Sequence, residues 1–330
     1  MKAVILAGGE GTRLRPLTYE TPKQMLPIVG RPMLEWVVSH LAAHGISEVV
    51  LALGYLPHRV VNAYPDQMVC GVPVSYVVEQ HPLDTAGGLR HAAAAAGINE
   101  TFVAMNGDVM TDLDLAAMVH FHHQRPTDLT VAVRPVSDPS SFGVVDFASD
   151  GAVSTFVEKP APGSTSSNHI NAGVYVLEPS VLDRIEPSAR VSLEREVFPL
   201  LARDRRIFAY PFDDYWIDTG TPTSYLRANM DVLEHRRTHS VSQFRDGSWH
   251  APSCTVEDTA LIVGSVLGPG VRVDSGAVIE NSVLLEGATV LANATVRRSI
   301  IGPGAIVHGE TSLDGAVVIA GSRESRTPIS

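Results

Sequence analysis

The chain has 330 residues, of which 45% are hydrophobic, so it can bury a large core and is expected to form more than one domain. Its 36 acidic and 25 basic side chains give a formal net charge of −11, which argues against nucleic acid or an anionic membrane surface as a partner. The two cysteines lack metal-ligand or disulfide spacing, and charged residues follow the N-terminus too early for a signal peptide, so we expect a cytoplasmic protein.

From residue 2 to about residue 234, short β-branched runs alternate with helical patterns, which is typical of parallel strands joined by crossover helices. The predicted strands are VILA (4–7), EVVLAL (48–53), VSYVVE (74–79), TFVAMN (101–106) and LTVAVRPV (129–136). Apolar residues within 34–42 fall at helical spacing, and Gly45 is placed to end that helix. We therefore expect an α/β fold with a doubly wound, mainly parallel sheet over residues 1–235.

From about Ser253 the pattern becomes a hexapeptide repeat, in which aliphatic residues recur every six positions. These residues are Leu267, Val273, Ile279, Leu285 and Leu291, followed after a ten-residue step by Ile301, Val307, Leu313 and Ile319. The residues two positions earlier are nearly all small enough for tight corners. The pattern predicts a parallel β-helix of about four coils of roughly 18 residues over 253–321. We expect 236–252 to be a linker and 322–330 a disordered tail.

The stretch LAGGEGTRLRPLT, residues 6–18, follows the first predicted strand and fits neither familiar phosphate-binding motif. A dinucleotide fingerprint needs a third glycine where Leu14 stands, and a Walker loop needs a lysine that Gly11-Thr12-Arg13 lacks. What remains is a glycine-rich turn whose backbone N–H groups can approach phosphate oxygens, at an edge where open α/β sheets bind ligands. The alternative is a turn without a ligand.

Two aspartates, Asp108 in NGD and Asp218 in WID, are each placed after a predicted or candidate strand. Two carboxylates combined with substrate phosphate oxygens are typical ligands of Mg²⁺, so the pair predicts a magnesium site. Either aspartate alone is more typical of a turn or a helix cap. Downstream, Thr221 and Pro222 are suited to the N-cap and first residue of a helix.

Two further motifs contain residues suited to sugar phosphates. In EKP, the proline biases Lys159 toward an extended backbone with a defined direction. In NAG, Asn171 offers an amide suited to hydroxyl groups, and Gly173 permits close approach of a ligand.

The sequence resembles the sugar-1-phosphate nucleotidylyltransferases in a series of motifs that occur in a fixed order. In chain order they are GGEGTRLRPLT with Lys23, PLDTAGG, NGD, FVEKP, INAGVYVL and YWIDTGTP, followed by the hexapeptide repeat. Within that family the chain looks most like mannose-1-phosphate guanylyltransferases with a left-handed β-helix, and next like glucose-1-phosphate thymidylyltransferases. The resemblance implies a Rossmann-like nucleotidyltransferase fold. It also implies that a sugar 1-phosphate oxygen attacks the α-phosphorus of a nucleoside triphosphate in line, and pyrophosphate leaves.

The resemblance also implies roles for particular residues. The catalytic residues would be Arg13, Lys23 and Asp108. The nucleotide would be bound by Leu6, Ala7, Gly8, Gly9, Gly11, Thr12, Arg13, Gln80, Gly87 and Gly88. The sugar phosphate would be bound by Gly143, Glu158, Lys159, Asn171 and Gly173. The metal, Mg²⁺, would be held by Asp108 and Asp218.

The base that the protein uses is ambiguous at this stage. Gln24 and Glu79-Gln80 lean toward thymidine, whereas most of 83–88 and the segment INAGVYVLEPSVLDRIEP favour guanylyl transfer, although Asp84 replaces a glycine common in that pattern. We predict GTP and mannose 1-phosphate as substrates. The alternatives are dTTP with glucose 1-phosphate, and guanylyl transfer to a modified sugar or cyclitol phosphate.

Other classes of protein are less favoured. Hexapeptide β-helices also occur in acyltransferases, in which His308 would be the base, but no acyl-donor signal accompanies the repeat, and a homo-oligomer (dimer or tetramer) assisted by the β-helix is expected instead. A regulatory paralogue would be expected to lose a phosphate-contact or metal residue, and all of them are present. HFHH (120–123) is expected to be a hydrated helical face, with metal binding as the alternative.

Overall fold

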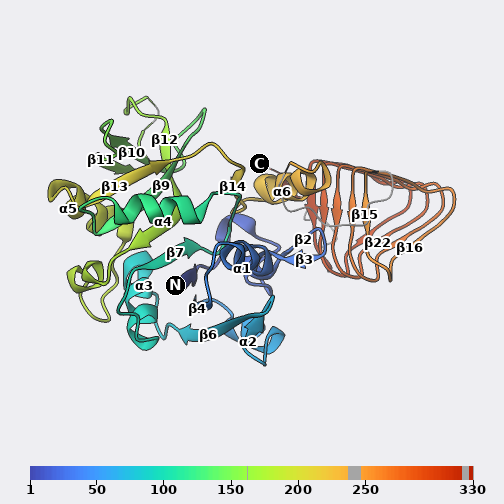
Figure 1. The fold of residues 1–330 in the computed structure, drawn as a ribbon. Coiled ribbons are helices and arrows are strands. Elements are labelled where there is room, and N and C mark those ends of the chain that lie inside the picture. The colour runs from blue at the N-terminus through green and yellow to red at the C-terminus, as the bar shows by residue number, and fades with distance from the viewer. Residues whose placement is uncertain (162, 237–246, 322–326, 330) are drawn as a thin grey trace. The chain divides into compact units, whose positions relative to one another are not determined.

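The computed structural model describes residues 1–161, 163–236, 247–321 and 327–329, which form two compact units (Figure 1). The first unit comprises Met1–Glu10 and Leu34–Trp216, and the second comprises Gly11–Met33 and Ile217–Ser330. The predicted linker and tail fall partly on 237–246, 322–326 and 330, which lie outside the described residues. The domain boundaries therefore stay predictions.

The first unit contains all the strands and the helix that the periodicity predicted. Its strands are β1 (Lys2–Ala7), β4 (Glu48–Leu53), β5 (Met68–Val69), β6 (Val72–Val78), β7 (Phe102–Asn106), β8 (Val109–Thr111), β9 (Leu129–Pro135), β10 (Gly143–Phe147), β11 (Val153–Glu158), β12 (His169–Leu177) and β13 (Ile207–Pro211), with β14 (Trp216–Asp218) crossing into the second unit. Its helices are α1 (Met33–Ala43), α2 (Pro57–Ala63), α3 (Asp84–Ala95), α4 (Leu115–His123), α5 (Phe198–Arg203), the 3₁₀ helix η3 (Pro179–Arg184) and the π-helix η4 (Leu193–Val197).

The large sheet of this unit has a parallel centre and an antiparallel extension. Strands β6, β4, β1 and β7 pair in parallel in that order, which confirms the predicted parallel core. Beyond β7, strand β12 runs antiparallel and pairs with both β9 and β10, while β13 pairs in parallel with β9. Because the central strands are parallel, the carboxyl ends of β1, β6 and β7 meet at one edge, where such sheets bind ligands.

The second unit combines a short N-terminal segment with one helix and a stack of coils. Its short elements are η1 (Thr12–Leu14), η2 (Lys23–Met25), β2 (Pro27–Ile28) and β3 (Arg31–Pro32), and its helix is α6 (Pro222–Leu233). The Thr221 hydroxyl accepts a hydrogen bond from the Ser224 N–H, and Pro222 occupies the first turn. The predicted N-cap and helix start are therefore confirmed.

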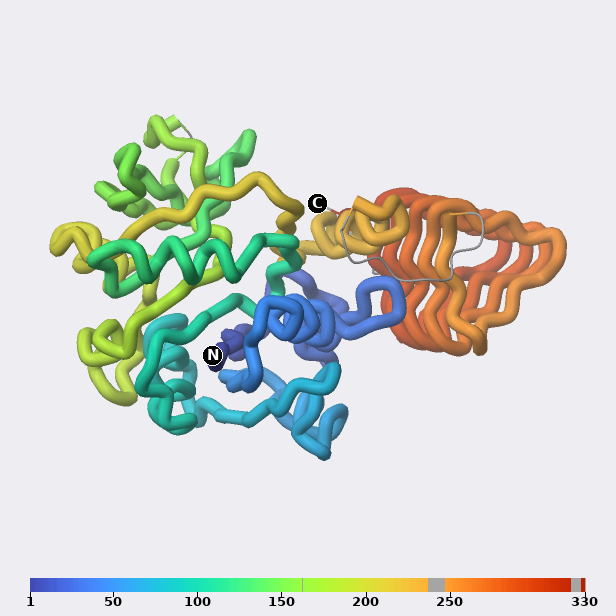
Figure 2. The backbone as a smooth tube through the Cα atoms, in the orientation of Figure 1, coloured from blue at the N-terminus to red at the C-terminus, as the bar shows by residue number. Residues whose placement is uncertain are grey.

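The coils are built from three parallel sheets, which Figure 2 shows as stacked turns of the tube. The first sheet contains β15 (Trp249–His250), β18 (Val266–Leu267), β21 (Val283–Leu284), β24 (Ile300–Ile301), β27 (Ala316–Val318) and β28 (Thr327–Pro328). The second contains β16 (Thr255–Val256), β19 (Arg272–Val273), β22 (Thr289–Val290) and β25 (Ile306–Val307), and the third contains β17 (Leu261–Val263), β20 (Val278–Glu280), β23 (Thr295–Arg297) and β26 (Ser312–Asp314). Neighbouring coils pair in parallel, and β28 alone among these described strands runs antiparallel to its neighbour. The arrangement is consistent with the expected left-handed β-helix.

The length of a coil differs from the expected value. Val266 pairs with Val283, so one coil takes 17 residues rather than about 18. Inward aliphatic residues follow steps of six, six and five, from Leu267 to Val273, Ile279 and Leu284. The strict period of six predicted Leu285, Leu291 and Ile319 as inward residues. Each was wrong by one position, because Leu284, Val290 and Val318 pack in the core of the coils instead. One side of each coil is a residue shorter than the other two.

A column of buried serines, one in each coil, lies along one corner of the β-helix. The column comprises Ser248, Ser265, Ser282 and Ser299, all 0% exposed. The Ser282 hydroxyl accepts the Ser299 N–H at 3.1 Å and donates to the carbonyl of Glu280 at 2.7 Å. The Ser265 and Ser299 hydroxyls make the equivalent bonds, so the column satisfies backbone groups that the corner removes from the sheet ladders.

Candidate functional site

The end of β1 and the turn after β7 are joined in the first unit. The Gly107 N–H donates to the Leu6 carbonyl at 2.9 Å, so Asp108 follows a turn that is fixed to the end of β1. The Gly8 carbonyl accepts the Tyr55 N–H at 3.1 Å, and the Asp108 residue is only 6% exposed. The unit thus brings the start of the glycine-rich loop and one predicted metal ligand to the same edge of the sheet.

Glu79, directly after β6, lies against this loop. A Cβ on Gly88 would lie 2.4 Å from the Glu79 Oε1 atom, and a Cβ on Gly8 would lie 3.3 Å from the same oxygen. The other oxygen, Oε2, accepts the Leu83 N–H at 3.0 Å, and burial raises the pKa of the Glu79 carboxyl. Gln80, which the resemblance assigned to the base, is exposed. Glu79 had been counted with Gln80 as leaning toward thymidine and was not predicted as a site residue, although it follows the strand immediately.

The start of α3 explains two features of the PLDTAGG stretch. Asp84 has a φ of +62°, the left-handed region that favours glycine, so a glycine would suit this position well. Its carboxylate pairs with Arg195 at 2.8 Å. A Cβ on Gly87 would lie 2.4 Å from the Ala189 carbonyl oxygen, so Gly87 is required by packing against the chain itself. Its predicted contact with the base stays a prediction.

The NAG motif lies in β12 around a buried tyrosine. The Asn171 Nδ2 atom donates to the Tyr175 hydroxyl at 2.9 Å, and the Gly173 N–H donates to Asn171 Oδ1 at the same distance. Burial raises the pKa of Tyr175 well above its ordinary value. A Cβ on Gly173 would lie 2.6 Å from the Asn106 Nδ2 atom, so this glycine lets β12 pass close to the NGD turn.

The EKP motif ends β11, opposite Gly143 on β10. Lys159 has a φ of +47°, in the left-handed region, so the extended backbone predicted for it was wrong. A Cβ on Gly143 would lie 2.3 Å from the Phe156 ring and 2.9 Å from Glu158 Oε2, so no larger residue fits there without movement. Burial, and then the nearby Glu194 carboxylate, raise the pKa of Glu158. The Lys159 Nζ atom lies 3.5 Å from Glu158 Oε1, and its side chain is 65% exposed. The lysine therefore presents its charge at the surface beside a half-buried carboxylate.

Glu194 was not predicted as a site residue and joins this group from η4. Its Oε2 atom accepts the Thr85 hydroxyl at 2.7 Å and the Ser192 hydroxyl at 2.9 Å. Its charge also contributes to the raised pKa values of Glu158 and Tyr175. Short π-helical turns are frequent at functional sites. No feature of the sequence SLEREV predicts a π-helix.

The second unit holds the cationic part of the glycine-rich loop. The Arg13 Nη2 atom lies 3.6 Å from Asp218 Oδ2, while Asp218 Oδ1 accepts the Gly220 N–H at 2.7 Å. A Cβ on Gly220 would lie 2.7 Å from both Arg13 Nη2 and Asp218 Oδ1. Gly11 has a φ of +62°, Thr12 begins η1, and the Arg13 side chain is 57% exposed. Arg13 and Asp218 are thus brought together.

The predicted magnesium ligands fall in different units, Asp108 in the first and Asp218 in the second. Their carboxylate oxygens are of the kind that Mg²⁺ prefers, and substrate phosphates usually complete its coordination. Within the described ranges, no group of three or more His, Cys, Asp or Glu side chains is close enough to hold a metal by itself. The donor chemistry fits magnesium, and the shared site stays a prediction.

The HFHH motif is divided between the surface and the core. His120 and His123 are exposed, as expected for a hydrated helical face. His122 is 1% exposed, and its ring nitrogens lie 2.8 Å from the Thr130 hydroxyl and 3.1 Å from Glu178 Oε1. Burial lowers the pKa of His122, because burial disfavours the charged form of a histidine.

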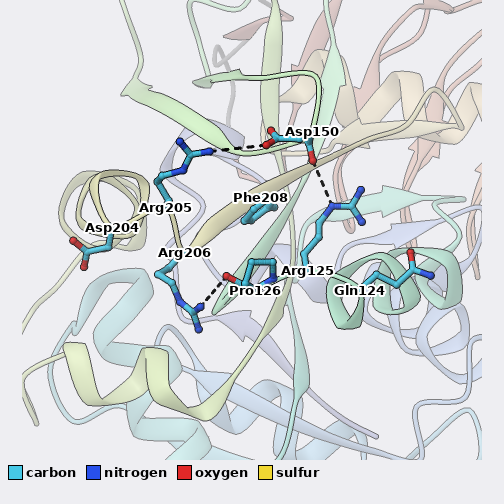
Figure 3. A pocket seen from close by; sticks show the side chains of 8 residues that line it. All are labelled: Gln124, Arg125, Pro126, Asp150, Asp204, Arg205, Arg206 and Phe208. Carbon is cyan, nitrogen blue, oxygen red and sulfur yellow. Dashed lines mark hydrogen bonds and ion pairs between the residues drawn. The ribbon is translucent and has the colours of Figure 1, made fainter.

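One cavity of about 760 Å³ lies in the first unit, and none of the residues described above lines it. Figure 3 shows three arginines around it, and each is already engaged. Arg125 contacts the Asp150 carbonyl, Arg205 lies 4.0 Å from an Asp150 carboxylate oxygen, and Arg206 donates to the Pro126 carbonyl. The cavity contains none of the residues that the sequence motifs identify, so it is not the candidate site.

Comparison with known proteins identifies the family. Residues 2–235 match the family described as nucleotidyl transferase, and residues 247–325 match the GMPPB C-terminal domain. The chain therefore belongs to the nucleotidyl transferase family. It is 39% identical over 280 residues to the mannose-1-phosphate guanylyltransferase of Mycobacterium tuberculosis, an alignment that covers 82% of this chain and 77% of the relative.

Two solved structures are also similar. A putative glucose-1-phosphate thymidylyltransferase from Bacillus anthracis, in complex with a sucrose, gives a TM-score of 0.64 at 26% identity, covering 74% of this chain and 98% of that one. HddC from Yersinia pseudotuberculosis, complexed with GMP-PN, gives 0.59 at 28% identity, covering 69% and 97%. Nucleotidyltransferases of this family typically use a divalent metal ion. No helix in the described parts of the chain is long and apolar enough to cross a membrane.

Proposed function

We propose that this protein transfers a guanylyl group from GTP to mannose 1-phosphate, releasing pyrophosphate and forming GDP-mannose. Membership of the nucleotidyl transferase family supports the reaction class. The name of the mycobacterial relative supports the pair of substrates. The position of Glu79 is the observation that favours guanine over thymine.

Glu79 is suited to guanine because of its hydrogen-bonding pattern. Guanine presents two neighbouring donors, N1–H and the 2-amino group, and an ionised carboxylate accepts two such bonds side by side. Thymine presents a single N3–H between two carbonyl oxygens, which a carboxylate would repel. The Glu79 Oε1 atom lies beside Gly8 and Gly88, two glycines assigned to the nucleotide, and the absence of side chains there leaves room for this carboxylate.

The sugar phosphate would meet the group built from β11, β12 and η4. Lys159 would bind the phosphate, while Glu158 and Asn171 would accept or donate hydrogen bonds to the sugar hydroxyls. Glu194 is a further candidate for hydroxyl recognition, since its charge acts on both Glu158 and Tyr175. Gly143 and Gly173 would keep the backbone close enough for these contacts.

Transfer itself requires positioning and charge neutralisation, and no covalent enzyme intermediate is needed. Arg13 and the backbone N–H groups of Gly8, Gly9, Gly11 and Thr12 would hold the triphosphate, with Arg13 stabilising the leaving pyrophosphate. Lys23 would contact the α-phosphate or the attacking oxygen. Asp108 and Asp218 would hold Mg²⁺, which when bound neutralises phosphate charge and orients the oxygens.

The proposal also includes assembly into a dimer or tetramer through the β-helix and a cytoplasmic location. Its domain limits are 1–235, 236–252 and 253–321. Transfer from dTTP to glucose 1-phosphate is the second candidate, because a putative thymidylyltransferase gives a TM-score of 0.64. Base selectivity separates the two reactions directly.

A Glu79→Gln variant tests the proposal. Wild-type protein is expected to prefer GTP over dTTP, and Glu79→Gln should lower kcat/KM for GTP by about 10- to 100-fold, because one bidentate contact to a base is worth about 1–3 kcal/mol. The exposed Glu100→Gln is the matched control and should leave kcat/KM within about twofold. A wild-type preference for dTTP would contradict the proposal. A larger loss in Gln80→Ala than in Glu79→Gln would assign the base to Gln80 instead.

A further inference from the structure

The segment that bears both predicted catalytic cations belongs to the same compact unit as the β-helix. Residues Gly11–Met33, which include Arg13 and Lys23, group with α6 and the coils, whereas β1 groups with the large sheet. Contacts within this second unit connect the segment to the first coil of the β-helix and to α6.

The segment contacts the β-helix where the aromatic ring of Trp249 packs against Gly30. Gly30 lies in the turn between β2 and β3, with a φ of +74°, and a Cβ added there would lie 2.1 Å from the Cη2 atom of Trp249. Two more ring atoms would lie within 2.8 Å of that Cβ. Trp249 is the first residue of β15, so the ring of the first coil fills the space that the missing side chain leaves.

Helix α6 holds the same hairpin by buried hydrogen bonds. The Val29 N–H donates to Asn229 Oδ1 at 2.9 Å, and the Asn229 Nδ2 atom donates to the Tyr225 carbonyl at 2.9 Å. The Tyr225 hydroxyl donates to the Pro27 carbonyl. Tyr225 and Asn229 are both 0% exposed, so these bonds are shielded from water and expensive to break.

A short series of contacts leads from the hairpin to Lys23. The Met33 N–H donates to the Leu26 carbonyl, and the Leu26 N–H donates to the Lys23 carbonyl, both at 3.1 Å. On the other side, a Cβ on Gly11 would lie 3.3 Å from the Lys23 Cβ, and the Thr18 hydroxyl donates to the Gly11 carbonyl at 2.8 Å. The backbone at Lys23 is therefore fixed between the hairpin and the glycine-rich loop.

We propose that Trp249 is a positioning residue for the transfer reaction: the first coil of the β-helix clamps the hairpin 27–32 and thereby sets the orientation of Lys23 and of the loop bearing Arg13. The inference rests on the proposed function, in which these cations contact the triphosphate. The β-helix is then a support of the nucleotide site as well as a stacking domain.

The experiment compares Trp249→Ala with Trp249→Phe in the full chain. Misplacement of a positioned group by about 1 Å can cost up to about 100-fold in rate, so Trp249→Ala should lower kcat/KM for GTP by about tenfold or more. The KM for mannose 1-phosphate should change by less than about twofold, and Trp249→Phe should recover most of the loss. Leu284→Ala removes buried bulk from β21, which β18 separates from β15 in the sheet, and it should keep the kinetics of the wild type.

A second readout does not depend on turnover. Amide hydrogen exchange over residues 12–33 should be faster in Trp249→Ala than in the wild type and unchanged in Leu284→Ala. Unchanged exchange in Trp249→Ala, or equal acceleration in both variants, would overturn the inference. If the wild-type protein shows no guanylyl transfer, the proposed function fails, and the exchange result still decides whether Trp249 fixes the loop.

Discussion

The first unit and the β-helix differ in the polar groups they bury. The first unit buries Asp108 and His122 and half-buries Glu79 and Glu158. Burial raises the pKa values of Glu79 and Glu158. Across the described residues 247–321, the polar side chains buried in the β-helix are serines. Burying a titratable group is costly, whereas a serine hydroxyl that completes a backbone ladder stabilises the fold.

The difference indicates where chemistry resides. Glu79, Asp108 and Glu158 lie at or just after the ends of β6, β7 and β11 in the first unit. The cations Arg13 and Lys23 lie in η1 and η2 of the second unit, outside the β-helix. His308, the base that an acyltransferase would need, is exposed on a coil. The β-helix therefore contributes geometry, and the following changes should affect the two regions in different ways.

Asp108→Asn is expected to have the largest effect. Loss of a carboxylate from the predicted magnesium site should lower kcat by about a thousandfold, because charge on the phosphates is then no longer neutralised. Asp218→Asn should behave alike if both residues hold the same ion. Initial rates across a magnesium titration measure both, with circular dichroism to verify folding.

The exposed Asp183→Asn variant is the matched control for this pair and should retain wild-type turnover. If Asp108→Asn turned over normally at saturating magnesium, the assignment of this residue to the metal would be wrong. A loss in Asp108→Asn alone would restrict the metal site to the first unit.

Lys159→Ala should have an intermediate effect that is confined to one substrate. Removal of the exposed ammonium beside Glu158 should raise the KM for mannose 1-phosphate by about tenfold and leave the KM for GTP within about twofold, since one charge-assisted contact is lost. The control is Lys2→Ala, because Lys2 lies at the end of β1 that is away from the glycine-rich loop. Equal rises for both substrates would rule out a specific role in binding the sugar phosphate.

Ser282→Ala should have the smallest effect, on stability alone. The change leaves the Ser299 N–H buried without its acceptor, at a cost of about 1–3 kcal/mol in the free energy of unfolding. Urea unfolding measures the loss, and the exposed Ser275→Ala should stay within about 0.5 kcal/mol of the wild type. A change in kcat/KM without a change in stability would contradict a purely structural role for the serine column.

The fold could be predicted largely from local patterns. Strand and helix periodicity located the central strands and α1, because each buries one face or both in a regular way. The antiparallel strands β10–β12 were not anticipated, since pairing direction depends on partners distant in the sequence. The 17-residue coil was visible in Ser265, Ser282 and Ser299, but Leu284 and Leu285 are adjacent aliphatics, and period alone could not decide which one faces inward.

The candidate site was less predictable for a physical reason. Motifs identified residues that follow strands, such as Asp108, but could not tell which of two neighbours, Glu79 or Gln80, faces the glycine loop. Glu194 enters from a π-helix and has no local signature. The link between Gly30 and Trp249 joins residues more than 200 positions apart, so only the folded chain reveals it.

The most direct test of the account is the identity of the product formed by the purified full-length protein. With GTP, mannose 1-phosphate and magnesium, we expect mass spectrometry to detect GDP-mannose together with stoichiometric pyrophosphate, and a chelator should abolish both. Formation of dTDP-glucose from dTTP and glucose 1-phosphate, with no GDP-mannose from the first pair, would contradict the account.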